Sequence, residues 1–178
     1  MRSLAILCAL AGAAHADGAY ITENIGPVRP GDQASDLPSG VQAEVHLGVR
    51  MGYWALELQF IADNFEPYPG SPETATMFAV GLGARYVQPI TRHFSLYLRG
   101  RASRGWGGDA LAGYAGNGLG AGAGIQLVGH ITLGKIPIAG GLFVDAGEDF
   151  YRLHGVMGDS IDTTLPVLSL GWALGTDF

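Results

Sequence analysis

The stretch Leu165–Phe178, LPVLSLGWALGTDF, ends the chain and decides its fold. Large apolar residues alternate there with small or polar ones, the large set being Leu168, Leu170, Trp172 and Leu174. A period of two is that of a β-strand, whose successive side chains point to opposite faces. The chain ends on an aromatic residue, Phe178, that continues the apolar face. The chain end of a soluble domain seldom has such a residue. We therefore expect a closing strand whose apolar face meets lipid.

Seven earlier segments show the same alternation. In the clearest of them the apolar residues Val41, Val45 and Val49 face one way, and Gln42 and Glu44 face the other. About ten residues is the length with which a tilted strand crosses a bilayer. The eight expected strands are Gly18–Gly26, Val41–Arg50, Tyr53–Asp63, Phe78–Tyr86, Phe94–Ser103, Leu119–Val128, Ile138–Asp145 and Leu165–Phe178.

The connections between these segments alternate between long and short. Short turns are expected at Met51–Gly52, Gln88–His93 and Gly134–Lys135. Long polar loops, rich in turn-forming residues, are expected at Pro27–Gly40, Asn64–Glu73, Arg104–Asn117 and Gly147–Thr163. The pattern predicts an all-β fold, an eight-stranded antiparallel transmembrane up-and-down β-barrel. Closure suits a membrane, because an unpaired strand edge in lipid costs several kcal/mol for each backbone group.

The first sixteen residues, MRSLAILCALAGAAHA, have the pattern of a secretory signal peptide. A basic Arg2 precedes an apolar run, and a small-x-small motif ends at Ala16. We expect residues 1–16 to be removed together with Cys8, the only cysteine, and residues 17–178 to form the barrel domain. The mature chain then carries 9 basic and 16 acidic residues, a net charge of 9 − 16 = −7. This charge argues against nucleic acid as a partner.

These features together resemble the small outer-membrane barrels of the OmpA type. The resemblance implies a monomer in the outer membrane of a Gram-negative bacterium, surrounded by outer-membrane lipid and lipopolysaccharide, with its long loops facing outward. It also implies that the barrel-assembly machinery reads an assembly signal formed by Leu170, Trp172, Leu174 and Phe178. Members of this type often carry a peptidoglycan-binding domain after the barrel. This sequence ends at Phe178, so we expect no such domain.

Two soluble folds also give alternating strands after a signal peptide, a lipocalin-like barrel and a secreted sandwich. Both bury their large apolar face. Aromatic residues near the expected strand ends favour lipid instead, since such girdles mark the two membrane interfaces. They are Trp54, Tyr86, Phe94 and Trp172.

The inward face of the expected barrel holds a set of ionisable residues, Glu44, His46, Arg50, Glu57, Asp63, Arg85, Arg99, Arg101 and Asp145. Four are acidic and four are arginines. Because an unpaired ion in a narrow lumen is costly, we expect arginine–carboxylate pairs with a structural role. Arg99 and Arg101 are expected to pair with Glu44, Glu57 or Asp63. The alternative interpretation is a narrow pore or ion channel.

No catalytic, cofactor-binding or metal site is expected. His154 and Ser160 lie near Glu148, Asp149 and Asp159, but no G-x-S-x-G motif is present. An outer-membrane lipid-modifying hydrolase remains a second alternative. The histidines lack metal-ligand spacing, and the acidic residues of the last loop, expected to be solvated, lack the spacing of a calcium loop. The glycine run from Gly116 to Gly124 is followed by no Lys-Ser/Thr pair, and it is expected to make room for inward arginines.

The sequence therefore favours a non-enzymatic barrel with a structural or surface-interaction role. External ligands would be contacted through the four long loops. Aromatic residues often anchor interfaces, and those expected in or beside the loops are Phe65, Tyr68, Trp106, Tyr114, Phe150 and Tyr151.

Overall fold

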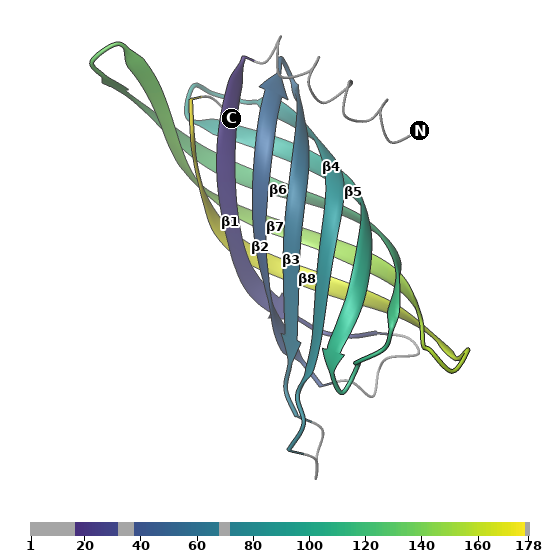
Figure 1. Ribbon diagram of the computed structural model, residues 1–178. Coiled ribbons are helices and arrows are strands. Elements are labelled where there is room, and N and C mark those ends of the chain that lie inside the picture. The colour runs from purple at the N-terminus through teal and green to yellow at the C-terminus, as the bar shows by residue number, and fades with distance from the viewer. Residues whose placement is uncertain (1–16, 32–37, 68–71, 177–178) are drawn as a thin grey trace, which may run out of the picture.

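The computed structural model describes residues 17–31, 38–67 and 72–176, which form a closed barrel of eight antiparallel strands in sequential order (Figure 1). The expected signal peptide, residues 1–16, and Phe178 lie outside these ranges. The strands are β1 (Gly18–Val28), β2 (Gly40–Met51), β3 (Trp54–Phe65), β4 (Ala75–Pro89), β5 (Phe94–Asp109), β6 (Ala115–Leu133), β7 (Ile136–His154) and β8 (Ser160–Gly175). The expected fold class is confirmed.

The strand register fixes the stagger of the barrel. The pairing leads from Val28 through one residue of each other strand, namely Val167, Gly147, Gly122, Arg99, Arg85, Ala55 and Arg50, and returns to β1 at Gly18. One circuit therefore shifts the register by 28 − 18 = 10 residues. A stagger of this kind accompanies strands tilted by roughly 35–45° from the barrel axis.

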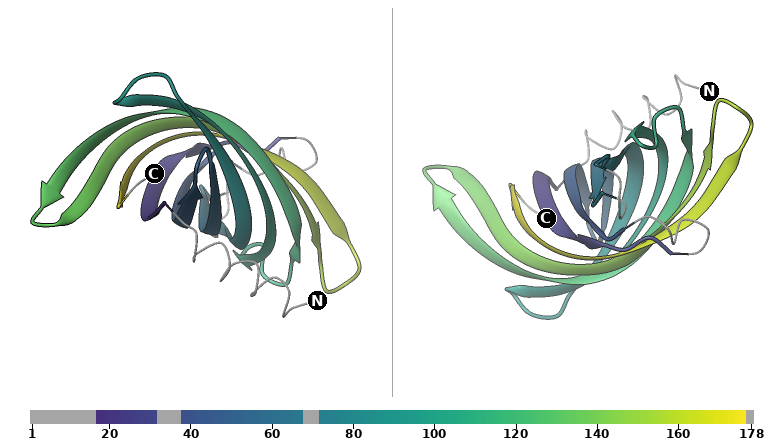
Figure 2. Two further views of the ribbon diagram at one scale, coloured as in Figure 1. Left: turned by 90° about the horizontal axis from the view of Figure 1, so that it is seen from above. Right: turned by 90° about the horizontal axis from the view of Figure 1, so that it is seen from below.

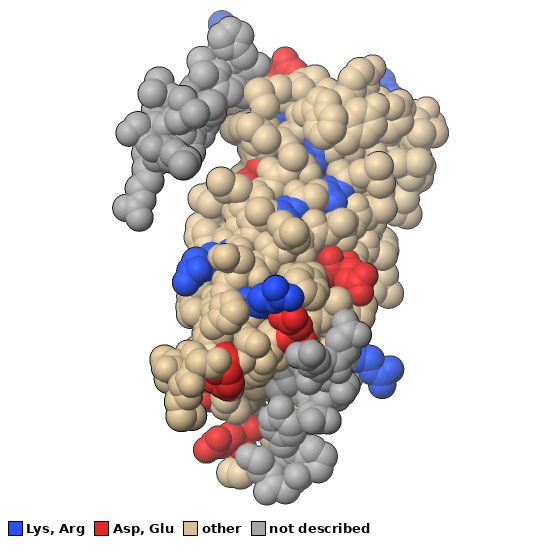
Figure 3. Space-filling model, turned by 90° about the vertical axis from the view of Figure 1, so that its right-hand side faces the viewer, with Lys and Arg blue, Asp and Glu red and all other residues tan. Residues whose placement is uncertain are grey.

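The two faces of the sheet differ as the sequence predicts. Most outward side chains of the strand centres are apolar and exposed, and most inward ones are polar and buried. Most of the molecular face in Figure 3 is uncharged, and its exposed acidic residues lie mainly toward the loop end. Among the described residues, no helix is long and apolar enough to span a membrane.

The tight turns lie where they are expected. Gly52 and Gly134 adopt φ angles of +61° and +66°, a backbone region that favours glycine and matches the twist of a two-residue hairpin.

The strands extend further toward the loop end than expected. The expected loop Arg104–Asn117 is wrong, since β5 and β6 continue through most of it and leave residues 110–114. The expected loop Gly147–Thr163 likewise shrinks to residues 155–159. Pro27 and Asn64, expected at the starts of the first two loops, belong to strands. In these segments glycine and polar residues occupy both faces, so the alternation fades while backbone pairing continues.

Two hairpins reach beyond the barrel rim in opposite directions (Figure 2). At the turn end β6 and β7 pair as far as Leu133 and Ile136, whereas the pairing of β5 with β6 stops at Leu127. The outward side chains of this overhang are aliphatic and exposed, including those of Ile131, Leu133 and Ile136. At the loop end, the β7–β8 hairpin overhangs in the same way (Figure 1).

The barrel interior has three layers. A cluster of buried residues at the loop end consists of Val28, Ile61, Phe65, Ala75, Met77, Ala79, Leu111, Tyr151, Leu153, Leu165 and Val167. A second cluster at the turn end consists of Tyr20, Ala55, Val87, Tyr97, Val128, Ala139, Phe143 and Ala173. The charged residues lie between these two apolar ends.

Candidate functional site

The middle layer of the interior is a network of buried ion pairs, with Arg101 of β5 at its centre. Arg101 donates from Nη1 to Oε1 of Glu44 at 2.6 Å and from Nε to Oδ1 of Asp149 at 2.8 Å. Its Nη2 also binds Asp149. Hydrogen bonds between ionised groups are roughly twice as strong as neutral ones. Arg101 therefore ties β2, β5 and β7 together across the lumen.

Arg99, one inward position away on β5, extends the network toward the turn end. Its Nε lies 3.0 Å from each carboxylate oxygen of Asp145, and its Nη2 donates to Oδ1 of Asp145 at 2.5 Å. Its Nη1 lies 3.8 Å from Oε2 of Glu44. Glu44 is consequently shared between two guanidinium groups.

Arg85 of β4 forms the third pair. Its Nη2 lies 2.8 Å from Oε1 of Glu57, and the Tyr20 hydroxyl donates to the same oxygen at 2.7 Å. Gln59 donates to the other Glu57 oxygen at 2.7 Å. The Arg85 guanidinium also lies 4.6 Å from the centre of the Tyr97 ring, a cation–π distance.

His46 joins these pairs into one network. Its Nε2 lies 2.9 Å from Oε2 of Glu44, and its Nδ1 lies 3.5 Å from Oε2 of Glu57. Its Nδ1 is also 3.4 Å from Nη2 of Arg85. Because every described member is buried, truncating one partner leaves another charge uncompensated.

Eight of the nine residues expected in the lumen lie in this interior, namely Glu44, His46, Glu57, Asp63, Arg85, Arg99, Arg101 and Asp145. The ninth, Arg50, lies at the turn end and donates from Nε to the Gly52 carbonyl at 2.8 Å. Arg101 and Arg99 both lie against Glu44, one of their expected partners. The closer partner of Arg99 is Asp145, which was not among those expected.

Asp149 is the member that sequence reasoning missed. It was expected in a solvated loop, but β7 continues through it and directs it inward against Arg101. Its separation of four residues from Asp145 was the available signal, because positions four apart share a face of a strand.

The described network therefore contains three guanidiniums and five carboxyl groups, not four of each. The carboxyls are those of Glu44, Glu57, Asp63, Asp145 and Asp149. Among the described residues Asp63 has no guanidinium partner, and its Oδ1 accepts a hydrogen bond from Gln42 at 2.8 Å. The interior is thus acidic on balance, with His46 between two of its carboxyl groups.

The inward face of β6 is a wall of five glycines, Gly116, Gly118, Gly120, Gly122 and Gly124. A Cβ on Gly120 would lie 2.0 Å from Oδ1 of Asp149 and 2.9 Å from Nε of Arg101. A Cβ on Gly122 would lie 3.0 Å from Nε of Arg99. The expectation that these glycines make room for arginines agrees with this geometry.

The loop end differs from the expected aromatic surface. Phe65 and Tyr151 point into the barrel and are buried, while Trp106 and Phe150 lie on its outer wall. Tyr114 is half-buried against the apolar cluster at this end. Tyr68 lies outside the described residues. The expected loop placement is therefore wrong for four residues, because longer strands place Phe65, Trp106, Phe150 and Tyr151 on the barrel wall or in its interior.

The most exposed large apolar side chains lie instead at the tip of the β7–β8 hairpin. Val156 is 87% exposed and Met157 is 92% exposed. The Gly155 N–H donates to the Asp159 carbonyl at 2.9 Å, and the Tyr114 hydroxyl donates to the Asp159 carboxylate. This last hydrogen bond raises the pKa of Tyr114 above its ordinary value. The tip is thus held in one shape while its apolar pair faces outward.

Below the tip, an exposed ion pair joins the two strands of the hairpin. Arg152 donates from Nε to Oδ1 of Asp162 at 2.8 Å and from Nη2 to Oδ2 at 2.9 Å. The hydrogen bond from Arg152 lowers the pKa of the Asp162 carboxyl. This pair holds the strands in register outside the apolar belt.

The residues considered for catalysis are not assembled into a triad. His154 and Ser160 are register partners on the exposed outer side of the hairpin. Their candidate acids are engaged elsewhere, Asp149 with Arg101 and Asp159 with Tyr114, and Glu148 faces outward on β7. Within the described ranges no group of three or more histidine, cysteine, aspartate or glutamate side chains is placed to hold a metal ion.

Three residues of the expected assembly signal, Leu170, Trp172 and Leu174, are exposed on the outer wall of β8. The fourth, Phe178, lies outside the described residues. Trp172 Nε1 donates to Oε2 of Glu23 on the neighbouring β1 at 3.1 Å. Glu23 is exposed between Ile21 and Ile25, so a carboxyl group interrupts the apolar wall.

Comparison with protein-family models and with curated proteins finds no match. The solved structure of Neisserial surface protein A (NspA) is similar, with 15% identity over 88% of this chain and 96% of that chain and a TM-score of 0.65. Ail, the attachment invasion locus protein of Yersinia pestis, has 15% identity over 89% of this chain and 97% of that chain, with a TM-score of 0.49. A major outer membrane protein from Thermus thermophilus has 14% identity over 89% of this chain and 99% of that chain, with a TM-score of 0.34. The chain is thus an eight-stranded closed antiparallel barrel that shares its fold with NspA.

Proposed function

We propose that this protein is a non-enzymatic outer-membrane barrel that acts by surface contact at its loop end. The outward apolar wall and the closed sheet support a location in lipid, as does the fold shared with NspA. The signal peptide, assembly by the barrel-assembly machinery, a monomeric state and the resemblance to the OmpA type belong to the same proposal.

The exposed tip of the β7–β8 hairpin is the observation that carries this function. Val156 and Met157 form an adjacent apolar pair at the end of a hairpin that overhangs the rim. Flexible, polarizable methionine side chains are common at binding surfaces. Because this end faces the cell exterior in the proposed orientation, the pair is available to an external partner.

Fractionation and surface labelling test the location. The protein should enter the outer-membrane fraction and should change its gel mobility on boiling. With Met157→Cys, a maleimide that cannot cross membranes should label intact cells, because this position is exposed at the hairpin tip. The new cysteine should be the one labelled, because Cys8 is expected to leave with the signal peptide. A soluble periplasmic protein, or labelling only after lysis, would contradict the proposed location or orientation.

Adhesion tests the contact role. Cells that display a variant with both Val156→Ser and Met157→Ser should adhere less to protein-coated and hydrocarbon-coated surfaces than cells with the parent protein. The matched control is Thr132→Ser with Lys135→Gln, two exposed changes at the opposite end. Equal adhesion of all three strains, at equal surface expression, would refute the role of the tip.

A further inference from the structure

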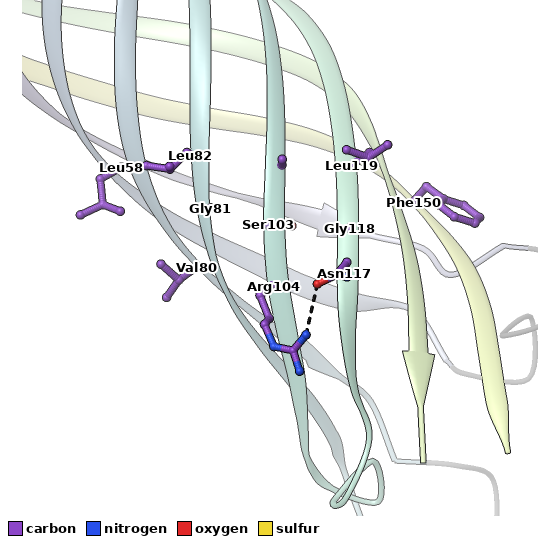
Figure 4. Close-up of a pocket in the computed structure, with 11 residues that line it drawn as sticks. Leu58, Val80, Gly81, Leu82, Ser103, Arg104, Asn117, Gly118, Leu119 and Phe150 are labelled. Atoms are coloured by element: carbon purple, nitrogen blue, oxygen red, sulfur yellow. Dashed lines mark hydrogen bonds between the residues drawn. The ribbon is translucent and has the colours of Figure 1, made fainter. Parts of the chain in front are cut away.

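The outer wall of the barrel carries a groove of about 610 Å³ across β3 to β7 (Figure 4). One row of register partners explains its shape, running Leu58, Leu82, Ala102, Leu119 and Phe150. Four of these side chains are large and exposed, and the fifth is a single methyl group. The wall is therefore notched at Ala102, with leucines on both sides.

Toward the barrel midline, the next row of outward register partners is small on three strands. It consists of Ala84, Gly100 and Ala121 on β4, β5 and β6, with Leu56 on β3 and Glu148 on β7 at its two ends. An extended hydrocarbon chain that lies over Ala102 therefore meets no large side chain on β5 as it continues toward the midline.

A cation closes the loop end of the groove. Arg104 lies two residues beyond Ala102 on the same face of β5 and donates from Nη1 to Oδ1 of Asn117 at 3.2 Å, as the dashed line in Figure 4 shows. Asn117 is a neutral amide, so no carboxylate among the described residues neutralises Arg104. Arg152 follows Asn117 in register on β7, about 10 Å across the strands from Arg104.

The groove thus pairs an apolar track with a basic head, and this combination fits a lipid that has a phosphate at its polar end. Guanidinium groups bind phosphate through paired N–H donors. Two arginines on alternate strands favour a headgroup with more than one phosphate, although Asp162 partly offsets Arg152.

We propose that the groove binds lipid A, the phosphorylated and acylated part of lipopolysaccharide, with one acyl chain over Ala102 and a phosphate on Arg104. This inference rests on the proposed outer-membrane location, which places the loop end in the leaflet that contains lipopolysaccharide. It assigns the site to the wall of the barrel and not to its loops.

The test titrates the folded full-length protein in detergent with bis-phosphorylated lipid A and compares variants. Arg104→Gln should weaken binding about tenfold through loss of a charge-assisted contact, and Arg104→Lys should restore most of it. Ala102→Leu should weaken binding by filling the notch. The controls, Arg92→Gln at the opposite end and Ala146→Leu on another exposed part of the wall, should bind as the parent protein does.

Titrations with dephosphorylated lipid A and with phosphatidylglycerol test whether the site recognises the phosphates and the lipid A structure. Both lipids should bind at least tenfold more weakly than bis-phosphorylated lipid A. The inference is overturned if Arg104→Gln and Ala102→Leu both bind within twofold of the parent, or if phosphatidylglycerol binds as tightly as lipid A. Either result would contradict the lipid A site but not the proposed outer-membrane location. The location would be contradicted by the fractionation test.

Discussion

Arg101 joins the buried carboxylates of Glu44 and Asp149 across the lumen, so its replacement should be costly. Among the described residues, Arg101→Met leaves Asp149 buried without a guanidinium partner and leaves Glu44 with only the more distant Arg99, and we expect a loss of about 3–5 kcal/mol in the free energy of unfolding. Urea titrations in lipid vesicles, followed by tryptophan fluorescence, measure this loss.

Asp149→Asn provides the second edge of a double-mutant cycle with Arg101→Met. The double variant should lose less than the sum of the two single variants, because removal of both partners leaves fewer unpaired charges. The exposed pair Arg152–Asp162 serves as a control, since Arg152→Met should cost much less than Arg101→Met. Strict additivity at Arg101 and Asp149 would show that their contact contributes nothing to stability.

The barrel with Glu23 should have a lower free energy of unfolding than a barrel with leucine at the same position. It faces outward between two isoleucines, and its described hydrogen-bond partner is the Trp172 indole. Glu23→Leu should raise the free energy of unfolding by about 1 kcal/mol, because acidic groups are unfavourable on the lipid face. The same urea titration measures it, with Val45→Leu, a register partner, as control. A less stable Glu23→Leu variant would indicate that the carboxyl group has a partner in the membrane.

The face on which each residue lies was predictable from sequence, because a strand alternates its side chains with a period of two. Arg85, Arg99 and Glu57 point inward as that period requires. Their partners were not predictable, since cross-lumen pairing depends on the stagger of the closed sheet. A stagger of ten residues brings Arg99 to Asp145, a partner 46 residues away.

At the scale of the elements, the glycine wall of β6 sets how far the arginines of β5 can extend. Gly120→Val would place a branched side chain against Asp149 and Arg101, and we expect a loss of about 2–4 kcal/mol from the displaced ion pair. Urea titration and the heat-modifiability gel measure it. The control is Gly140→Val on β7, where an added Cβ has no atom within 4 Å. Equal stability of both variants would mean that the interior adapts to the added volume.

The same glycines explain why the strand ends were misjudged. A glycine carries no side chain to alternate, so β6 shows no clear period between Ala115 and Gly118 although its backbone is paired throughout. The end of β5 has the same property at Gly105 and Gly107. Hydrogen-bonded pairing, which sequence reasoning does not see, extends both strands.

For the whole molecule, the layered interior should leave no conducting path. The charged middle lies between two apolar clusters, and its side chains are bonded to one another. Purified protein in planar bilayers should give no reproducible channels at neutral pH. Channels that change with Arg101→Met, but not with Arg152→Met, would support the narrow-pore alternative and contradict the packed interior.

The β6–β7 overhang makes the apolar wall taller on one flank than on the other. Outward apolar positions run from Val41 to Met51 on β2, which is ten residue steps, and from Leu119 to Leu133 on β6, which is fourteen. With about 3.3 Å per step and the tilt of such barrels, these spans rise roughly 25 Å and 35 Å along the axis.

A flat bilayer with a core of about 30 Å cannot match both spans at once, so the barrel should lean in the membrane or distort the lipid around it. The bilayer should thin beside β2 and thicken beside β6 and β7. Shortening the tall flank with Leu133→Ser and Ile136→Ser should reduce the lean, which polarised infrared spectroscopy of oriented membranes can measure. A protein of this shape acts as a wedge, and it should sort lipids by length, gathering longer chains along one side and shorter chains along the other.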